Sequence, residues 1–128
     1  MAADIRENKC IVLQSRPGVN NEPSESNFVL ETREVPPCNE GEILVKTLYL
    51  SVDPYMRCRM NDSTGSSYLT PWPLGEPASG GGVGKVLQSR SEKFQVGDIL
   101  ESFMWPWQEF VAFSGEDPSL HKVDMHLA

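Results

Sequence analysis

The chain has 128 residues, with 18 acidic and 11 basic side chains and a formal net charge of −7. This length suits one domain with a buried core. Nucleic acids and anionic membranes are disfavoured as partners, because both require clustered positive charge and the sequence has no lysine or arginine block. No apolar run approaches the length of a membrane span, and residues 1–9 are polar and of mixed charge, unlike a signal peptide.

Short strands separated by turns are expected along the whole chain, which contains 10 glycines and 10 prolines. Apolar and alternating runs predict strands at residues 10–14, 28–35, 43–52, 79–87, 96–104 and 108–113. The last of these is expected to pair with its predecessor across Trp105-Pro106-Trp107. Residues 15–27 and 61–75 predict irregular loops, and residues 120–127 predict either a helix or a frayed tail. Short strands at near-regular spacing indicate an all-β barrel or sandwich.

The cysteines Cys10, Cys38 and Cys58 are odd in number and widely spaced, with no Cys-x-x-Cys pair. This pattern favours reduced thiols over a disulfide framework, and it makes the cytoplasm the expected compartment.

The run from Leu48 to Met60 combines the end of a predicted strand with side chains that could bind a ligand. It is apolar up to Val52, and the Asp53-Pro54 pair then stops the strand. A tyrosine follows, with a methionine and two arginines, Arg57 and Arg59, close behind it. Two interpretations stay open: an aromatic hydroxyl with fixed positive charge beside a cleft, or a half-buried tyrosine with solvated arginines at a turn.

The glycine cluster at residues 80–84 superficially suggests a nucleotide-binding loop. That loop needs Gly-x-Gly-x-x-Gly between a strand and a helix, so that helix N–H groups meet the pyrophosphate. Here Lys85 stands where the third glycine is required, and an apolar strand pattern follows it. The cluster therefore predicts close backbone packing at a bend of the barrel.

A metal site is not expected, because the two histidines, His121 and His126, have no cysteine near them in sequence. Gly75 and Glu76 are adjacent, so no histidine stands between them that could serve as a further metal ligand. The sequence also lacks the Gly-x-Ser-x-Gly pattern of hydrolases.

Aromatic and apolar residues suited to a lipid-like ligand remain. One interpretation is a greasy wall with a few hydroxyl donors. The other is that Trp105-Pro106-Trp107 forms a rigid connection whose rings merely cover the barrel end. The residues in the first interpretation are Tyr55, Tyr68, Phe103, Met104, Trp105 and Trp107.

Several of these segments, in their order and spacing, resemble the N-terminal catalytic domain of the medium-chain dehydrogenase/reductase superfamily. They are Glu34-Val35-Pro36-Pro37, Gly41–Lys46, Asp53–Arg57, Phe94–Leu100 and Phe103–Trp107. Asp53–Arg57 combined with Phe103–Trp107 is similar to the zinc-free leukotriene/prostaglandin reductase branch. The resemblance runs from about Ile11 to the last residue. It implies a mostly β fold, a GroES-like barrel with short helices, over residues 1–128.

The resemblance implies NADPH-dependent reduction of the carbon–carbon double bond of α,β-unsaturated ketones such as 15-keto-prostaglandins, without a metal. By matching motifs, Tyr55 is the expected catalytic residue, and Pro54 and Tyr55 are expected to border the nicotinamide. The expected substrate-binding residues are Tyr55, Tyr68, Phe103 and Met104. Near relatives carry tyrosine where Met104 stands, which leaves the preferred ketone open.

In this superfamily a nucleotide-binding Rossmann domain follows the barrel and binds most of the NADPH, and its glycine-rich loop is not found in this sequence. Half of an active site, with that domain as its partner and a lipid enone as substrate, is therefore expected. The alternative is a non-catalytic barrel that binds apolar ligands or partner proteins through an exposed interface. A co-chaperonin is a weaker interpretation, since the glycine-rich loops contain no apolar tripeptide to anchor on a partner ring.

Overall fold

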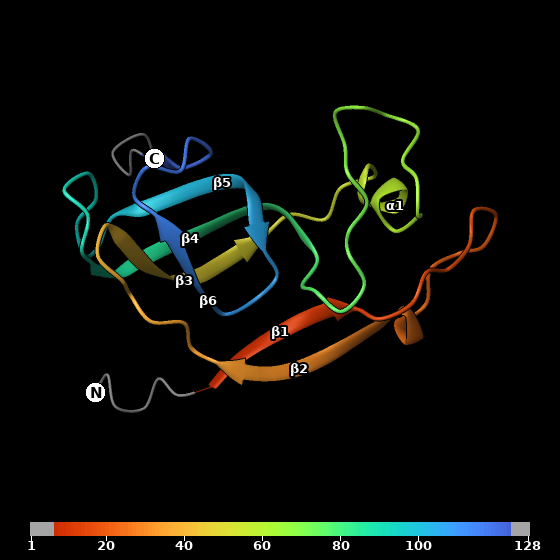
Figure 1. Ribbon diagram of the computed structural model, residues 1–128, viewed down its shortest axis with the longest axis horizontal. Helices are drawn as coiled ribbons and strands as arrows, with labels where there is room; N and C mark the ends of the chain where they lie inside the picture. Colours follow the sequence, from red (N-terminus) through yellow and green to blue (C-terminus); the bar gives the residue numbers. More distant parts are fainter. Residues whose placement is uncertain (1–6, 124–128) are drawn as a thin grey trace.

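The computed structural model describes residues 7–123, which form two antiparallel sheets with short helical turns between them (Figure 1). A two-stranded sheet pairs β1 with β2, and a five-stranded sheet has the order β6-β3-β4-β5-β7. The elements are β1 (Glu7–Leu13), η2 (Glu25–Asn27), β2 (Phe28–Glu34), β3 (Glu42–Leu50), α1 (Met56–Arg59), β4 (Ser79–Ser89), β5 (Ile99–Pro106), β6 (Phe110–Ser114) and β7 (His121–Lys122).

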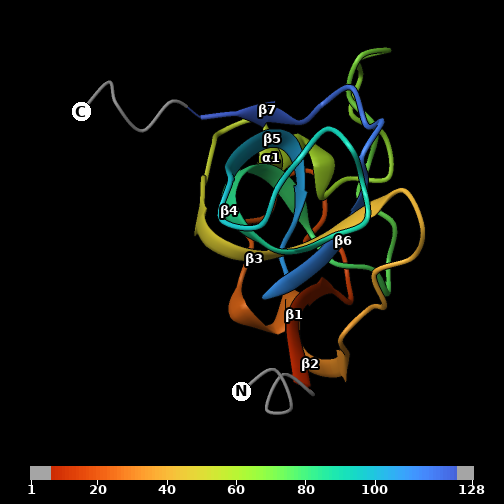
Figure 2. The same cartoon turned by 90° about the vertical axis from the view of Figure 1, so that its left-hand side faces the viewer.

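The five-stranded sheet curls around its own core, and Figure 2 shows this curl end on, with the two-stranded sheet lying below it. The helix α1 and the loop 61–75 stand at one end of the barrel (Figure 1). The expectation of a mostly β, barrel-type domain is confirmed.

The bounds of the observed strands differ from the predicted ones by up to three residues, and in two cases the prediction included exposed apolar residues that lie outside the sheet. The strand expected at 43–52 stops at Leu50, and Val52 is 79% exposed. The strand expected from Val96 begins only at Ile99, because Val96 and Gly97 belong to a turn. In that turn the Gln95 N–H donates to the Asp98 carboxylate at 2.8 Å, and Gly97 adopts a φ of +97°. Both errors follow from apolar residues that lie outside the sheet.

The expected pairing of β6 with β5 is wrong, because β6 pairs with β3 instead. Pro106 ends β5 without a backbone N–H to continue the ladder. The next residue, Trp107, donates its N–H to Ala78 at 2.7 Å and accepts from Ile11 at 2.9 Å. The chain is thereby drawn toward β1 and does not turn back as a tight hairpin.

Near the C-terminus, the helix considered for residues 120–127 does not form at His121–Lys122, which are the strand β7. This strand pairs with β5, where Glu101 stands opposite His121. Residues 124–128, including His126, lie outside the described residues.

The core consists of two hydrophobic clusters. The barrel cluster contains Ile43, Val45, Val86, Leu100, Trp105, Val111, Phe113 and Leu120. The second cluster, under α1, contains Leu13, Met56, Trp72 and Ala78. Trp105 is fully buried, meets the ring of Phe113 edge-on at a centroid distance of 5.0 Å, and donates from Nε1 to Thr47 Oγ1 at 2.7 Å. A buried indole with its N–H satisfied is stabilising in both its apolar and polar parts.

The glycines of β4 allow this indole to lie against the strand. A Cβ at Gly82 would lie 2.5 Å from Trp105 Cγ, and a Cβ at Gly84 would lie 2.5 Å from the Lys46 carbonyl oxygen. Both are impossible contacts without movement of a ring or of backbone. The prediction that this cluster serves close packing at a barrel bend is confirmed, and β4 is a strand with no helix following it.

We expect Gly82→Ala to destabilise the chain by about 1–3 kcal/mol, as overpacking of a rigid core does. Gly81→Ala is the matched control, because its Cβ would meet Ser51 Cβ at 3.3 Å, a contact that a small shift relieves. Urea unfolding followed by tryptophan fluorescence measures both variants. Equal midpoints for the two would contradict the assigned packing.

Candidate functional site

The segment after β3 places Tyr55 beside β4. Asp53 accepts from the Met56 N–H at 3.0 Å and, through its carboxylate, from the Ser51 hydroxyl at 2.8 Å, which shapes the turn into α1. Met56 is 3% exposed and anchors the helix in the second core cluster. A Cβ at Gly80 would overlap Met56 Cε and would lie 3.1 Å from Tyr55 Oη. The tyrosine therefore rests against bare backbone of the barrel.

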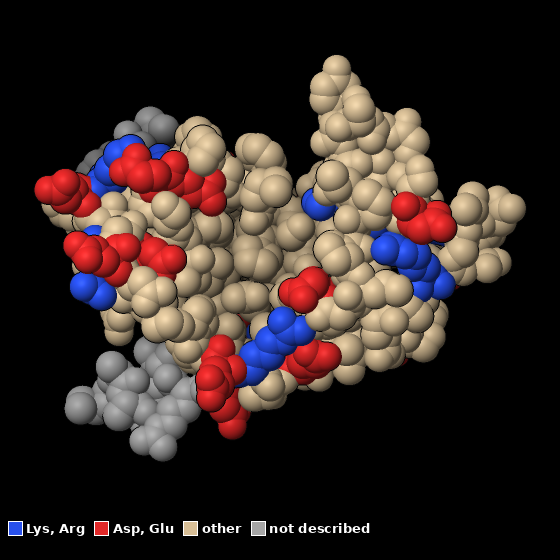
Figure 3. Space-filling view, in the orientation of Figure 1, with Lys and Arg blue, Asp and Glu red and all other residues tan. Residues whose placement is uncertain are grey.

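A cleft of about 360 Å³ opens between α1, the loop 61–75 and the end of β5. In Figure 3 a hollow separates the barrel from the lobe that carries this loop, and the surface around it is largely uncharged. Its lining residues are Tyr55, Arg59, Tyr68, Leu69, Thr70, Phe103 and Met104.

All of the residues predicted to contact substrate, namely Tyr55, Tyr68, Phe103 and Met104, line this cleft. They come from segments almost 50 positions apart, so their convergence is a property of the fold. Pro54 is exposed and does not line the cleft. Their roles toward substrate and cofactor stay predictions.

The two tryptophans of the predicted greasy wall do not reach the cleft. Trp105 is buried inside the barrel. Trp107 packs beside the second core cluster, where its ring lies 6.3 Å from that of Trp72. A break in the alternation along β5 explains the first case. Gly80 of β4 stands opposite Trp105 and Gly82 opposite Ser102, so the register shifts between them, and both Phe103 and Met104 are exposed while Trp105 is buried. Of residues 103–107, only Phe103 and Met104 line the cleft, together with Tyr55 and Tyr68.

Sequence reasoning named Arg59 without assigning it to the site. Arg59 follows Tyr55 by four positions, so the two side chains share one face of the helical turn. Its guanidinium is buried and donates from Nε to the Thr70 carbonyl at 2.8 Å, and it lies 5.6 Å from the centroid of the Trp72 ring. Burial lowers the pKa of Arg59 from its ordinary value, and the nearby Tyr55 opposes that shift.

Arg57 and Arg59 have separate tasks. Arg57 donates from Nη2 to the Asn21 carbonyl at 2.9 Å and from Nη1 to Asn61 Oδ1 at 2.8 Å, which ties the loop 15–27 to α1. Arg59 faces the cleft. The interpretation of fixed positive charge beside a cleft therefore holds for Arg59, and Arg57 is a structural clasp.

The loop 61–75 is held in place although it has no regular structure. Arg16 donates to the carbonyls of Met60, Asn61 and Trp72, each at 3.0 Å, and so joins the two ends of the loop. Near the tip, Tyr68 is 98% exposed at the rim of the cleft.

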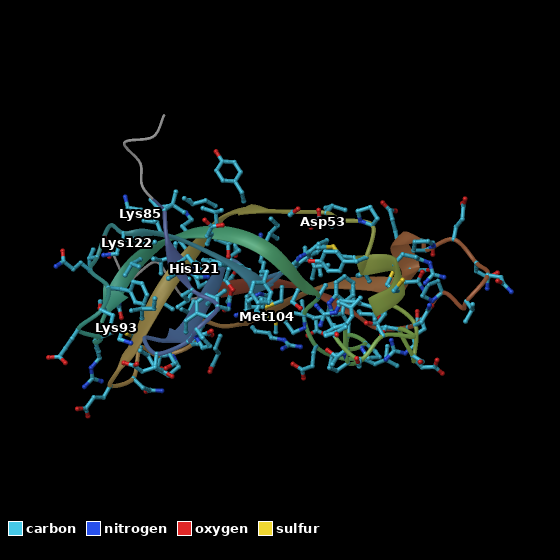
Figure 4. All side chains as sticks on the ribbon, turned by 90° about the horizontal axis from the view of Figure 1, so that it is seen from above. Asp53, Lys85, Lys93, Met104, His121 and Lys122 are labelled. Carbon is cyan, nitrogen blue, oxygen red and sulfur yellow. The ribbon has the colours of Figure 1, made fainter. Side chains whose placement is uncertain are left out.

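A second hollow of about 420 Å³ adjoins the cleft and shares Phe103 and Met104 with it. Its other wall is formed by Asp117, Pro118 and Ser119. Figure 4 shows Met104 between the barrel and α1, whereas Lys85, Lys93 and Lys122 lie toward the opposite end of the barrel. Met104 thus lines both hollows.

The described residues bear on cofactor and metal binding in different ways. Pro54 and Tyr55 are both exposed, and Tyr55 lines the cleft; that they border the nicotinamide stays a prediction. The glycines of β4 are occupied by core packing, so they do not form a phosphate cradle. Within residues 7–123, no group of three or more His, Cys, Asp or Glu side chains is arranged to hold a metal ion.

Comparison with known families identifies the fold. Residues 9–123 match the family described as the N-terminal domain of oxidoreductase. This chain belongs to that family. The CurA structure from Vibrio vulnificus in complex with NADPH superposes with a TM-score of 0.77 at 37% identity, over 89% of this chain and 32% of that chain. The fold is thus the GroES-like N-terminal domain of the medium-chain dehydrogenase/reductases.

Curated relatives agree with this assignment. The NADPH-dependent curcumin reductase of Escherichia coli is 38% identical over 117 residues, which cover 91% of this chain and 32% of the relative. The NADP-dependent 2-alkenal reductase of Nicotiana tabacum is 38% identical over 113 residues, covering 86% and 32%. Rat prostaglandin reductase 1 is 37% identical over 82 residues, covering 64% and 22%. The first two of these relatives are named as NADPH- or NADP-dependent reductases, and the similarity extends beyond the prostaglandin reductases.

The chain spans about a third of the length of the curated relatives it matches. Among the described residues, no helix is both long enough and apolar enough to cross a bilayer.

The cysteines are free thiols in different surroundings, and none lines the cleft. Cys10 is 1% exposed, and burial raises the pKa of its thiol. Cys38 is half-buried and Cys58, on α1, is exposed.

We expect N-ethylmaleimide to modify Cys58 first and Cys10 last in the folded chain, because Cys10 is covered and a raised pKa lowers its thiolate fraction at any given pH. Peptide mass spectrometry after timed labelling measures the order. Labelling in denaturant is the control, in which the rates converge. A Cys10 that reacts as fast as Cys58 in the native chain would contradict the described burial.

Proposed function

We propose that this chain forms the substrate side of an NADPH-dependent reductase of α,β-unsaturated carbonyl compounds, with 15-keto-prostaglandins as the substrates. The observation that carries the proposal is the convergence of Tyr55, Tyr68, Phe103 and Met104 on one cleft. The curcumin, 2-alkenal and prostaglandin reductases named above are relatives that act on such compounds or take their names from them.

The reaction needs a hydrogen-bond donor near the carbonyl oxygen. NADPH, when bound, supplies a hydride. The β-carbon of the enone accepts it, the electrons of the carbon–carbon double bond shift to make an enolate, and the α-carbon then takes a proton. The Tyr55 hydroxyl is a donor at the wall of the cleft, and a donor aimed at the developing oxyanion lowers the barrier.

The cleft also suits the body of a lipid enone. Leu69, Phe103 and Met104 provide apolar walls, and the adjoining hollow beyond Met104 offers room for a second chain of the substrate. A prostaglandin carries chains on both sides of its ring, whereas a small alkenal fills one hollow alone. This division favours the larger substrates within the reductase class.

NADPH is proposed to bind mainly to a nucleotide-binding domain that packs against this one, as a partner. Support comes from β4, whose glycines contact Trp105 and Met56 and leave no loop for the pyrophosphate. Pro54 and Tyr55 would then border only the nicotinamide. The reduced cysteines are compatible with action in the cytoplasm.

A second candidate function is binding of an apolar ligand or a partner protein without catalysis. It is favoured by exposed apolar side chains at the end of β3 and just beyond, where Tyr49 is 73% and Val52 is 79% exposed. The two functions differ in whether an enone and NADPH are consumed.

In a protein that joins this chain to its nucleotide-binding domain, we expect Tyr55→Phe to lower kcat for a 15-keto-prostaglandin about tenfold to a thousandfold, as loss of one positioned donor does. NADPH oxidation followed optically measures the effect. Tyr49→Phe is the control, because Tyr49 is exposed outside the cleft. Unchanged turnover in Tyr55→Phe would make Tyr55 a packing residue, and absence of turnover in the unmutated protein would refute the proposed function.

For the 128-residue chain alone, we expect calorimetry to show no tight NADPH binding, because the pyrophosphate has no cradle among the described residues. Micromolar affinity would contradict the division of the cofactor site between two domains.

A further inference from the structure

Among residues 7–123, Arg59 is a buried cation that has no anionic partner. The residue is only 7% exposed, yet it lines the cleft. The ion pairs of residues 7–123 join Arg33 to Glu31 and Glu76, Lys93 to Glu116, and Lys122 to Asp98, and none of them includes Arg59. Buried charges are normally paired, because removal from water is costly.

The contacts that Arg59 does make are with neutral oxygens. It donates from Nε to the Thr70 carbonyl at 2.8 Å, from Nη2 to Thr70 Oγ1 at 3.3 Å, and from Nη1 to Ser79 Oγ at 3.4 Å. A guanidinium has five N–H donors, so these contacts leave donors free. The guanidinium carbon also lies over the Trp72 ring, 5.6 Å from its centroid, a cation–π contact.

The charge is therefore held still, incompletely neutralised and directed at an apolar space. The other arginine of α1, Arg57, faces backbone carbonyls of the loop 15–27 and not the cleft. Tyr55 shares the cleft wall with Arg59 and supplies a neutral donor beside the cationic one. Two donors of this kind, side by side, fit an oxygen that carries delocalised negative charge.

We propose that the cleft is a binding site for a delocalised oxyanion on an apolar carbon skeleton, of the enolate or phenolate class, held by Arg59 and Tyr55 together. The inference deepens the proposed function and rests on it in one respect: the enolate formed during enone reduction is such an oxyanion. Binding of the oxyanion itself requires neither NADPH nor a second domain. Arg59 is then a residue that stabilises the reacting oxygen.

The walls decide between classes of anion. Leu69, Phe103 and Met104 are apolar and disfavour a fully hydrated phosphate, whereas a phenolate or enolate buries its carbon skeleton against them. The net charge of −7 repels anions in general. Any preference for an anion must therefore come from local charge, which makes the site testable with a simple probe.

The test compares 4-nitrophenol with 4-nitroanisole, its methyl ether, on the unmutated 128-residue chain. The phenolate is coloured and the anisole has nearly the same shape but does not ionise. At a pH where the probe is mostly phenolate, we expect the phenolate to bind about tenfold to a hundredfold more tightly than the anisole, the effect of a hydrogen bond to a charged group. Bound probe should also ionise at lower pH than free probe.

Arg59→Met should abolish both the preference and the ionisation shift while the anisole still binds, and Arg59→Lys should restore part of the preference because it keeps the charge. Arg90→Met is the control for overall charge, since Arg90 is exposed and lies outside the cleft. A merely structural Arg59, one that only fastens Thr70, would weaken both probes equally.

Equal affinity of phenolate and anisole for the unmutated chain would overturn the proposal, and this comparison needs no variant that might fail to fold. An ionisation shift that persists in folded Arg59→Met would also overturn it. If the phenolate binds through Arg59 while the two-domain protein fails to oxidise NADPH with an enone, the oxyanion site stands and the proposed function fails.

Discussion

The rest of the structure depends on the packing of the Trp105 indole against the bare backbone of β4. Gly82 and Gly84 allow the ring to lie where any side chain would collide with it, and Thr47 satisfies its N–H from β3. One buried residue thus joins three neighbouring strands. Because Trp105 turns inward, the two residues before it, Phe103 and Met104, are left at the barrel end facing α1.

Strand positions followed largely from hydrophobic pattern, whereas strand order did not. Alternation and β-branched residues place β3 and β4 within a few residues, since burial of one face sets the period. The pairing of β6 with β3 depends on Pro106 lacking an N–H and on hydrogen bonds from Trp107 to distant backbone, which no local pattern encodes. Val96 misled the prediction because an exposed apolar residue in a turn looks like the start of a strand.

Motif resemblance was sufficient to predict which residues line the candidate site. It was not sufficient to predict the roles of the two arginines, because those roles depend on burial and contacts in the folded chain. Tyr55, Tyr68, Phe103 and Met104 were named from matching motifs, and the fold brings them to one cleft. Arg57 and Arg59 are alike in sequence, but one clasps a loop and the other enters the cleft. Spacing from Tyr55 places Arg59 on the same helical face; that it has no carboxylate partner among residues 7–123 emerges only in three dimensions.

Stability and site geometry are coupled through β4. Gly80 lies against Tyr55 and Met56, and Gly82 and Gly84 lie against Trp105, so one strand packs on both the proposed catalytic residue and the barrel core. A shift of β4 that made room for a side chain at Gly82 or Gly84 would move the support of the tyrosine as well. The absence of side chains at Gly80, Gly82 and Gly84 therefore serves rigidity, because the hydroxyl of Tyr55 rests on backbone, which has fewer conformations than any side chain that could replace it.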